Sequence, residues 1–203
     1  MVDNITKTQL EILTLYLNNY LNRFHVREIA KLIKKSHVTL LPHLKELEKN
    51  NILKFKIEGK NKIYFLNLED SKINEYLSMA EKLKTLRLLE KEMFINKLYS
   101  EIQNMNLQGS LIIFGSYANN TQTKESDIDI LYIGNLSEIQ EKTVKNLEKL
   151  YNKHIHLVKM DEKTFNKSLN SELIQEIIKN HIILYNHDLF INKLRMFYNE
   201  KKI

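Results

Sequence analysis

The spacing of hydrophobic residues divides the chain into three segments, which we predict to be domains or linkers at 1–70, 71–107 and 108–203. In the first segment, hydrophobic residues recur at helical spacing until two short alternating runs surround Gly59. A glycine between two alternating runs is typical of a β-hairpin turn. The first segment is therefore predicted to contain several helices followed by a hairpin.

The other two segments differ in their periodicity. Residues 71–107 keep helical spacing throughout, which predicts one or two long connector helices. Residues 108–203 alternate between apolar runs and helical patterns, which predicts an α+β domain with a small mixed sheet flanked by helices. Strands are expected at 111–114, 128–133, 154–159 and 181–185, and helices near 116–121, 137–151, 162–180 and 188–199.

Composition narrows the classes of protein to consider. The absence of cysteine excludes disulfides and thiolate metal sites. The N-terminus shows no basic stretch before a long apolar run, and no run approaches the roughly 18 apolar residues of a membrane span. We therefore expect a cytoplasmic protein without a membrane partner.

Residues 1–70 hold twelve Lys and Arg against eight Asp and Glu, so +4 of the net +6 lies there. A nucleic-acid partner should be sought first in that segment.

The first segment resembles the winged helix-turn-helix superfamily over roughly residues 8–68. The order of elements is that of the superfamily: a short helical pattern at 26–34, a break, a second helical pattern at about 38–50, and then the hairpin. The resemblance implies that the second helix enters the major groove of DNA and that the hairpin contacts the DNA backbone or minor groove. Such domains also dock proteins, and the four wing lysines favour DNA. The candidate DNA-binding residues are His37, Thr39, His43 and Lys45 on the helix and Lys54, Lys56, Lys60 and Lys62 on the wing.

Pro42 complicates the start of the second helix. If Ser36 caps that helix, Pro42 lies beyond the first turn and removes a backbone hydrogen bond. If Thr39 is the cap, Pro42 falls within the first turn, where proline is tolerated. We therefore expect Thr39 to be the N-cap.

The strongest chemical signal lies in the third segment. The apolar run 111–114 stops at Gly115 and Ser116, and ten residues later Asp127 and Asp129 share one face of the next predicted strand. Glycine lets the backbone approach a ligand closely, and amides with a hydroxyl can hold phosphates. Two carboxylates beside them suit Mg²⁺ carried by a polyphosphate.

This motif, between two apolar strands, resembles the minimal nucleotidyltransferases of the DNA polymerase β superfamily. Its spacing is also that of nucleotidyltransferase antitoxins paired with HEPN-type toxins, and the likeness extends over about 90–187. It implies transfer of a nucleoside monophosphate from a nucleoside triphosphate to a hydroxyl, with Mg²⁺ or Mn²⁺ on Asp127 and Asp129. It also implies a HEPN-type toxin as a partner. The phosphates are expected on Gly115, Ser116, Lys124 and Ser126.

Two departures from the family pattern bear on activity. Asn119 and Asn120 stand where members commonly carry a basic residue and glycine, so Lys124 would have to supply the missing cation. His156 stands where active members carry a third carboxylate, and it is a candidate general base. Histidine is a poor ligand for Mg²⁺, which leaves three outcomes open. The site binds nucleotide without turnover, turns over slowly on one metal ion, or recruits Mn²⁺ or Zn²⁺ through His156.

Two functions therefore remain open from the sequence. The protein is either a nucleotidyltransferase that also binds DNA, or a DNA-binding regulator or antitoxin whose nucleotidyltransferase domain is weak or inactive. The basic first segment favours the regulator, and the intact pair of aspartates favours the enzyme. The apolar content of 71–107 allows a homodimer through the connector, or a connector packed on its own domain.

Overall fold

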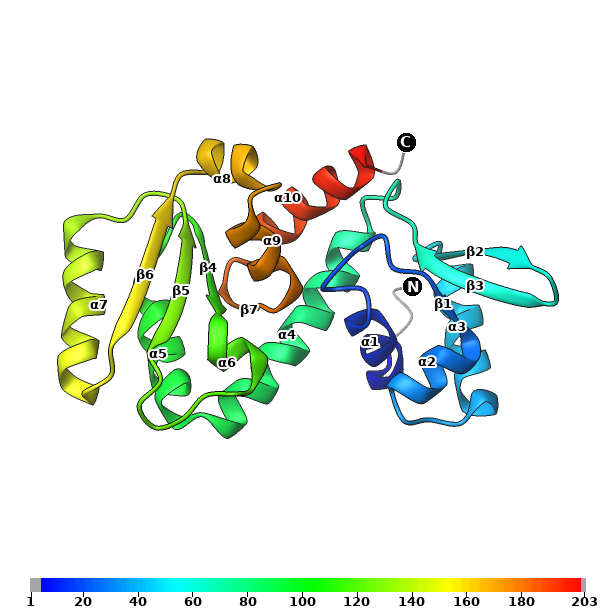
Figure 1. The fold of residues 1–203 in the computed structure, drawn as a ribbon, viewed down its shortest axis with the longest axis horizontal. Helices are drawn as coiled ribbons and strands as arrows, with labels where there is room; N and C mark the ends of the chain where they lie inside the picture. Colours follow the sequence, from blue (N-terminus) through cyan, green and yellow to red (C-terminus); the bar gives the residue numbers. More distant parts are fainter. Residues whose placement is uncertain (1–4, 202–203) are drawn as a thin grey trace. The chain divides into compact units, whose positions relative to one another are not determined.

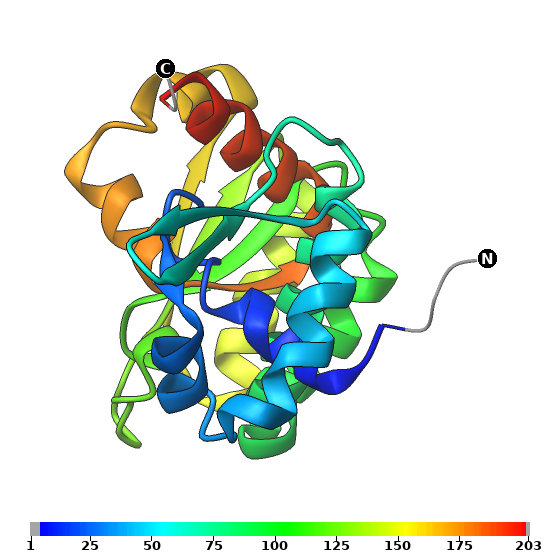
Figure 2. The ribbon, with the colours of Figure 1, turned by 90° about the vertical axis from the view of Figure 1, so that its right-hand side faces the viewer.

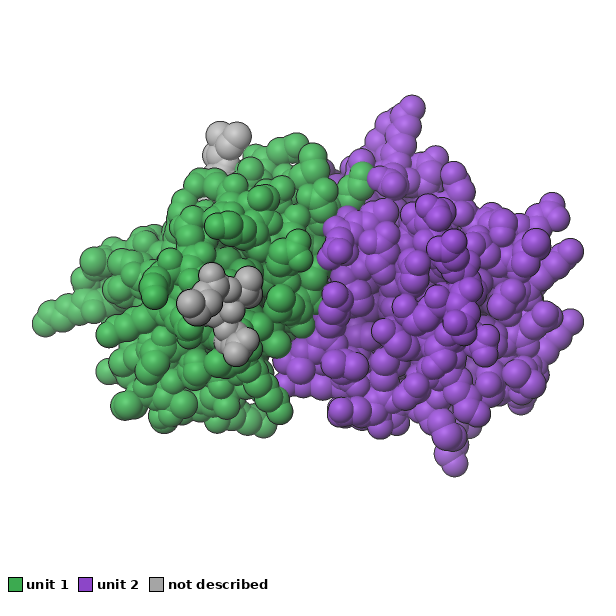
Figure 3. All heavy atoms as spheres, turned by 180° about the vertical axis from the view of Figure 1, so that it is seen from behind, with its two compact units in different colours: residues 1–81, 191–203 green, residues 82–190 purple. Residues whose placement is uncertain are grey.

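The computed structural model describes residues 5–201. Its helices and strands form two compact units, one made of residues up to 81 together with those from 191 onward, the other of 82–190 (Figure 3). Helices α4 (Ile73–Lys91) and α10 (His187–Glu200) each contribute to both units. None of the helices within 5–201 is long and apolar enough to cross a lipid bilayer.

The first unit combines three helices with a small antiparallel sheet (Figures 1 and 2). Strand β3 lies between β1 and β2, and β2 and β3 form the predicted hairpin around Gly59. Strand β1 was not predicted, because two residues are too short to show a periodicity. The elements are α1 (Lys7–Thr14), β1 (Phe24–His25), α2 (Val26–Leu32), α3 (His37–Lys49), β2 (Leu53–Glu58) and β3 (Asn61–Leu66).

Helix α3 begins earlier than expected. The hydroxyl of Ser36 accepts the backbone N–H of Thr39 at 3.1 Å, so Ser36 is the N-cap and the prediction that Thr39 caps the helix is wrong. Pro42 therefore lies inside the helix, where its missing N–H leaves the carbonyl of Val38 without its helical donor. The helix tolerates this because one side is fully buried, through Leu40, Leu44 and Leu47.

Replacing Ser36 by alanine should lower the free energy of unfolding by about 1 kcal/mol, because the N–H of Thr39 loses its acceptor. Urea denaturation would measure the change. Thr39→Ala serves as the comparison, since it removes the hydroxyl that lies 2.7 Å from that of Ser36 and leaves the capping acceptor in place. Equal losses in both variants would contradict the assignment of the cap.

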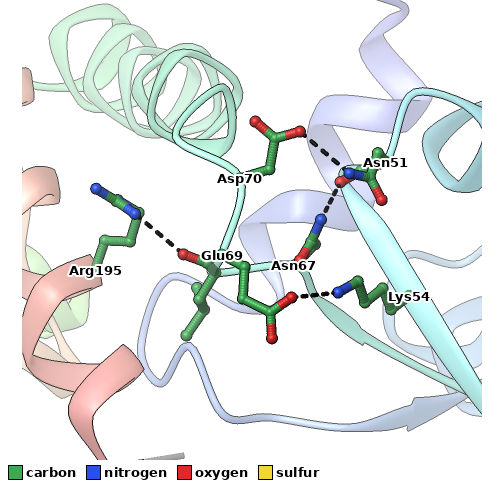
Figure 4. A network of polar contacts seen from close by, with 7 residues as sticks. Asn51, Lys54, Asn67, Glu69, Asp70 and Arg195 are labelled. Carbon is green, nitrogen blue, oxygen red and sulfur yellow. Dashed lines mark hydrogen bonds and ion pairs between the residues drawn. The ribbon is translucent and has the colours of Figure 1, made fainter.

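A polar network joins the segment after β3 to the rest of the first unit (Figure 4). The side-chain amide of Asn67 donates to the carbonyl of Asn51 at 2.9 Å, and the amide of Asn51 donates to Asp70 at 3.2 Å. Arg195 of α10 donates to the carbonyl of Leu68 at 3.1 Å. The last helix is thereby bonded to the chain that leaves the hairpin.

The second unit is built on a four-stranded mixed sheet in the order β6-β5-β4-β7 (Figure 1). Strands β5 and β6 are parallel, and the other neighbouring pairs are antiparallel. The predicted small mixed sheet with flanking helices is therefore confirmed. The elements are α5 (Met93–Asn104), β4 (Ser110–Phe114), α6 (Gly115–Asn119), β5 (Ile128–Ile133), α7 (Glu138–Tyr151), β6 (Ile155–Met160), α8 (Glu162–Ser168), α9 (Glu172–Lys179) and β7 (Ile182–Tyr185).

A hydrophobic core holds α5 and α7 against alternate positions of the two central strands. Because successive side chains of a strand point to opposite faces, every second residue of β4 and β5 reaches this core. Of the intervening residues of β5, Asp129 forms the polar end of the strand, whereas Leu131 and Ile133 are buried. The core includes Leu98 and Ile102 of α5, Val144 and Leu147 of α7, Leu111 and Ile113 of β4, and Ile130 and Tyr132 of β5.

One predicted helix is interrupted. The expected helix 162–180 is two helices, because Ser171 accepts the N–H of Ile174 at 3.4 Å and starts a new helix there. The connector, predicted as one or two helices, is two, separated at Glu92, whose backbone is extended. Asp161 begins α8 as an N-cap and accepts the N–H of Thr164 at 2.6 Å; this hydrogen bond lowers the pKa of the Asp161 carboxyl.

Candidate nucleotide site

Four polar side chains meet at the start of β5 and β6. The two strands are parallel, and their register sets Asp129 opposite His156. Nδ1 of His156 lies 3.1 Å from Oδ1 of Asp129, and Nδ1 of His154 lies 3.5 Å from Oδ2 of Asp127. Because alternate strand residues share a face, the structure brings together both predicted aspartates and His156.

The two aspartates differ in their exposure. The side chain of Asp129 is 28% exposed and is held by His156, whereas that of Asp127 is 58% exposed. Asp129 is therefore the better fixed of the two carboxylates, and Asp127 is open to a ligand from solvent. A fixed carboxylate beside an accessible one suits a metal site that is completed when a ligand binds.

Gly115 allows the close approach that brings Asp129 to the main chain. It follows β4, has a φ of +65°, and a Cβ placed on it would lie 2.2 Å from Oδ2 of Asp129. No side chain fits there, and L-residues rarely adopt this backbone conformation. Ser116 follows directly in the short helix α6 and is half-buried. Gly115, Ser116 and Asp129 thus form one edge of the site.

The other two predicted phosphate ligands lie in the loop before β5. The hydroxyl of Ser126 accepts the N–H of Thr123 at 2.8 Å, so it closes a turn of that loop. The side chain of Lys124 is exposed, and its carbonyl accepts the ammonium of Lys153. Lys153 was missed in the sequence, although its position directly before His154 could have drawn attention to it.

The donor set fits a metal ion that arrives with a nucleotide. Among residues 5–201 no group of three or more His, Cys, Asp or Glu side chains is placed to hold a metal ion. Asp127 and Asp129 nevertheless offer the oxygen donors that Mg²⁺ prefers. Mg²⁺ is commonly bound through one or two carboxylates, with substrate phosphates and water as its other ligands. Two carboxylates are therefore enough for a site in which the protein and the nucleotide share the ligands of one metal ion.

The candidate DNA-binding residues lie on α3 and the hairpin of the first unit. His37, Thr39 and Lys45 are exposed, whereas His43 is half-buried with Nδ1 at 3.3 Å from Oγ1 of Thr6. A pocket of about 530 Å³ in this unit is lined by His37 together with Lys60 and Lys62 of the hairpin. These three side chains come together although they are distant in the sequence.

Three of the four wing lysines pair with carboxylates of the same unit. Lys54 lies 2.6 Å from Glu69, and Lys62 lies 3.3 Å from Glu48 with its ammonium over the ring of Phe55. Lys56 pairs with Glu58, while Lys60 is exposed on the turn. Ion pairs of the chain itself therefore give a second explanation for lysines that the sequence alone attributes to DNA.

Comparison with known proteins identifies the second unit. A sequence model described as "Nucleotidyltransferase domain" matches residues 95–185, which include Gly115, Asp127, Asp129 and His156. "Putative protein adenylyltransferase MJ0604" of Methanocaldococcus jannaschii is 33% identical over 94 residues, which are 45% of this chain and 91% of that protein. The chain belongs to the nucleotidyltransferase family. Proteins of this family use a nucleoside triphosphate and a divalent metal ion.

A second curated protein and a solved structure are also similar to this chain. "Putative protein adenylyltransferase MJ1547" of the same organism is 36% identical over 94 residues, which are 46% of this chain and 66% of that protein. A crystal structure of a toxin-antitoxin with AMP-PNP is similar at a TM-score of 0.38 and 23% identity, over 53% of this chain and 88% of that chain. The family match begins at residue 95 and ends at 185, so it leaves the first unit outside it.

Proposed function

We propose that the protein binds a metal-bound nucleoside triphosphate at Gly115, Ser116, Asp127 and Asp129 and transfers its nucleoside monophosphate to a hydroxyl acceptor. The observation that carries the proposal is the position of the Asp129 carboxylate, which occupies the space where a side chain of residue 115 would be. The relatives named as protein adenylyltransferases favour ATP as the donor and a protein hydroxyl as the acceptor.

The side chains of the site have separate tasks in this proposal. Asp127 and Asp129 would hold Mg²⁺ or Mn²⁺, which would offset the charge of the triphosphate and orient its α-phosphate. Ser116 would donate its hydroxyl to a phosphate oxygen. His156 keeps the carboxylate of Asp129 in place through the 3.1 Å hydrogen bond. Lys124 and Ser126 remain proposed phosphate ligands on the neighbouring loop.

The reaction exchanges a phosphoanhydride bond for a phosphoester bond. The acceptor oxygen bonds to the α-phosphorus, and the bond from that phosphorus to the oxygen bridging to the β-phosphate breaks, so pyrophosphate leaves. The hydroxyl proton passes to a base or to water, and His156 remains the predicted base. Incubating the full chain with α-labelled ATP and Mg²⁺ or Mn²⁺ should therefore label a hydroxyl acceptor and release pyrophosphate. Tight ATP binding without pyrophosphate release would favour a regulator with an inactive site.

We infer a second function for the first unit, namely DNA binding through a winged helix-turn-helix domain at about 1–70. The order of three helices followed by a hairpin, with β1 paired to it, supports this inference. So does the meeting of His37, Lys60 and Lys62 around one pocket. The wing ion pairs do not oppose it, because exposed pairs contribute only about 0–1 kcal/mol and phosphates can replace the carboxylates.

Removing Lys56, Lys60 and Lys62 together should flatten the salt dependence of DNA binding. Each lost phosphate contact should reduce the slope of log affinity against log salt by about 0.9, because fewer counterions are released. Fluorescence anisotropy with DNA from upstream of the gene, at several salt concentrations, would measure the slope. A double variant of Lys142 and Lys145, exposed on α7, is the matched control. An unchanged slope in the triple variant would indicate that the hairpin docks protein.

Two partners expected from the sequence remain proposals. A HEPN-type toxin would make the protein an antitoxin that regulates its own operon, and this rests on the spacing of the Gly-Ser and Asp-x-Asp motif. A homodimer through the segment 71–107 rests on its apolar content. Size measurement of the purified protein, alone and with the product of the adjacent gene, would test both.

A further inference from the structure

A pocket of about 580 Å³ opens beside Asp127, within the second unit. It lies between the loop before β5 and the junction of α7 with β6. Asp127 is part of its wall, so the pocket offers space to a ligand held by this carboxylate. The other residues that line it are mainly charged or polar, and three of them are lysines: Lys124, Lys149 and Lys153.

The local backbone explains why the lysines gather there. Helix α7 ends at Asn152, which has a φ of +49° and turns the chain toward β6. The next residue is Lys153, whose ammonium donates to the carbonyl of Lys124 across the pocket. Lys149 lies in the last turn of α7 and is exposed. The three lysines therefore line one cavity, although they come from a loop, a helix and a turn.

Stabilising the end of α7 is the simplest alternative role for these lysines, because cations favour the C-terminus of a helix. The backbone closes that end on one carbonyl, since the N–H groups of Asn152 and Lys153 both donate to the carbonyl of Glu148. The ammonium of Lys153 instead reaches Lys124, 29 residues away. The ammonium of Lys153 is thus bonded to the loop before β5 and not to the helix terminus.

The three acidic residues of the pocket each have another partner. Glu148 accepts the N–H of Ile155 at 2.8 Å and so fixes the start of β6. Asp127 faces His154 and is the proposed metal ligand. Glu125 is exposed on the loop and accepts the hydroxyl of Thr123 at 3.3 Å. A metal ion on Asp127 would offset that charge and leave the cationic wall in excess.

We propose that Lys124, Lys149 and Lys153 bind the β- and γ-phosphates of the nucleotide. This rests on the proposed function, because a metal ion on Asp127 shares its ligands with the triphosphate and brings phosphate oxygens to this wall. Ammonium groups and phosphate oxygens form charge-assisted hydrogen bonds, which are stronger than neutral ones. The pocket supplies the cation that Asn119 and Asn120 lack after the Gly-Ser turn.

Calorimetry on the full chain tests this proposal with three probes: Mg²⁺-ATP, inorganic tripolyphosphate and AMP. In Lys149→Ala/Lys153→Ala, the affinity for ATP and tripolyphosphate should fall roughly tenfold or more, as expected for a lost hydrogen bond to a charged group. AMP, which lacks the β- and γ-phosphates, should bind as it does to the wild type. Lys142→Ala/Lys145→Ala on the same helix is the matched control and should change none of the three.

The outcomes separate this inference from the proposed function. If the wild type binds ATP and the lysine variant binds ATP and tripolyphosphate equally well, the inference is wrong and the nucleotide site stands. The same holds if only transfer to the acceptor falls, because the pocket would then hold the acceptor. A wild type that does not bind ATP contradicts both. Lys153→Arg keeps the charge and should retain most of the wild-type affinity. A general loss of folding on substitution at this position would lower the affinity of this variant as well.

Discussion

Asp129→Asn should abolish nucleotidyl transfer, with a loss of roughly a thousandfold or more in the rate of pyrophosphate release. The amide has nearly the shape of the carboxylate, so the hydrogen-bonding position opposite His156 can be kept and the sheet should fold. It carries no charge and offers one oxygen where the carboxylate offers two. The stabilisation of the triphosphate by a metal ion, worth several kcal/mol, should therefore be lost.

Initial rates with α-labelled ATP and saturating Mg²⁺ would measure this effect. Glu138→Gln is the control, since it makes the same chemical change at an exposed residue in the first turn of α7. Circular dichroism should show both variants folded. If Asp129→Asn kept the wild-type rate, the transfer would arise elsewhere, and the assignment of this carboxylate to the metal would be wrong.

The alternation of strand residues was the most productive signal in the sequence. It predicts that Asp127 and Asp129 share a face, and that His154 and His156 share one on the next strand. The structure sets these four side chains into two pairs across the β5–β6 register. A period of two is a property of the backbone, which is why so much of this geometry follows from local sequence.

Contacts between distant segments could not be predicted in this way. The ammonium of Lys153 reaches a carbonyl of the loop before β5, and Lys54 and Lys62 meet Glu69 and Glu48 only after the hairpin has folded. The prediction of the N-cap of α3 was wrong for a related reason. A proline inside the helix disfavours Ser36 as the N-cap, but burial of one side of the helix outweighs one missing hydrogen bond.

Gly115→Ala should reduce nucleotidyl transfer by roughly a hundredfold, as expected when a catalytic group is misplaced by about 1 Å. The added methyl carbon would lie 2.2 Å from Oδ2 of Asp129, and a positive φ of +65° adds about 1–2 kcal/mol of backbone strain. The carboxylate is the tip of a side chain, so it should rotate away from residue 115 while the strands stay in place. Activity should therefore fall far more than stability.

Gly59→Ala offers a matched control for the strain. Its φ of +59° imposes a similar backbone cost, but no atom lies within 4 Å of the added carbon. Both variants should lose about the same free energy of unfolding in urea, and only Gly115→Ala should lose transfer. If both lost activity equally, general destabilisation would explain the result. If neither did, the close contact between residue 115 and Asp129 would have no part in the chemistry, and the carboxylate would function equally well from a second position.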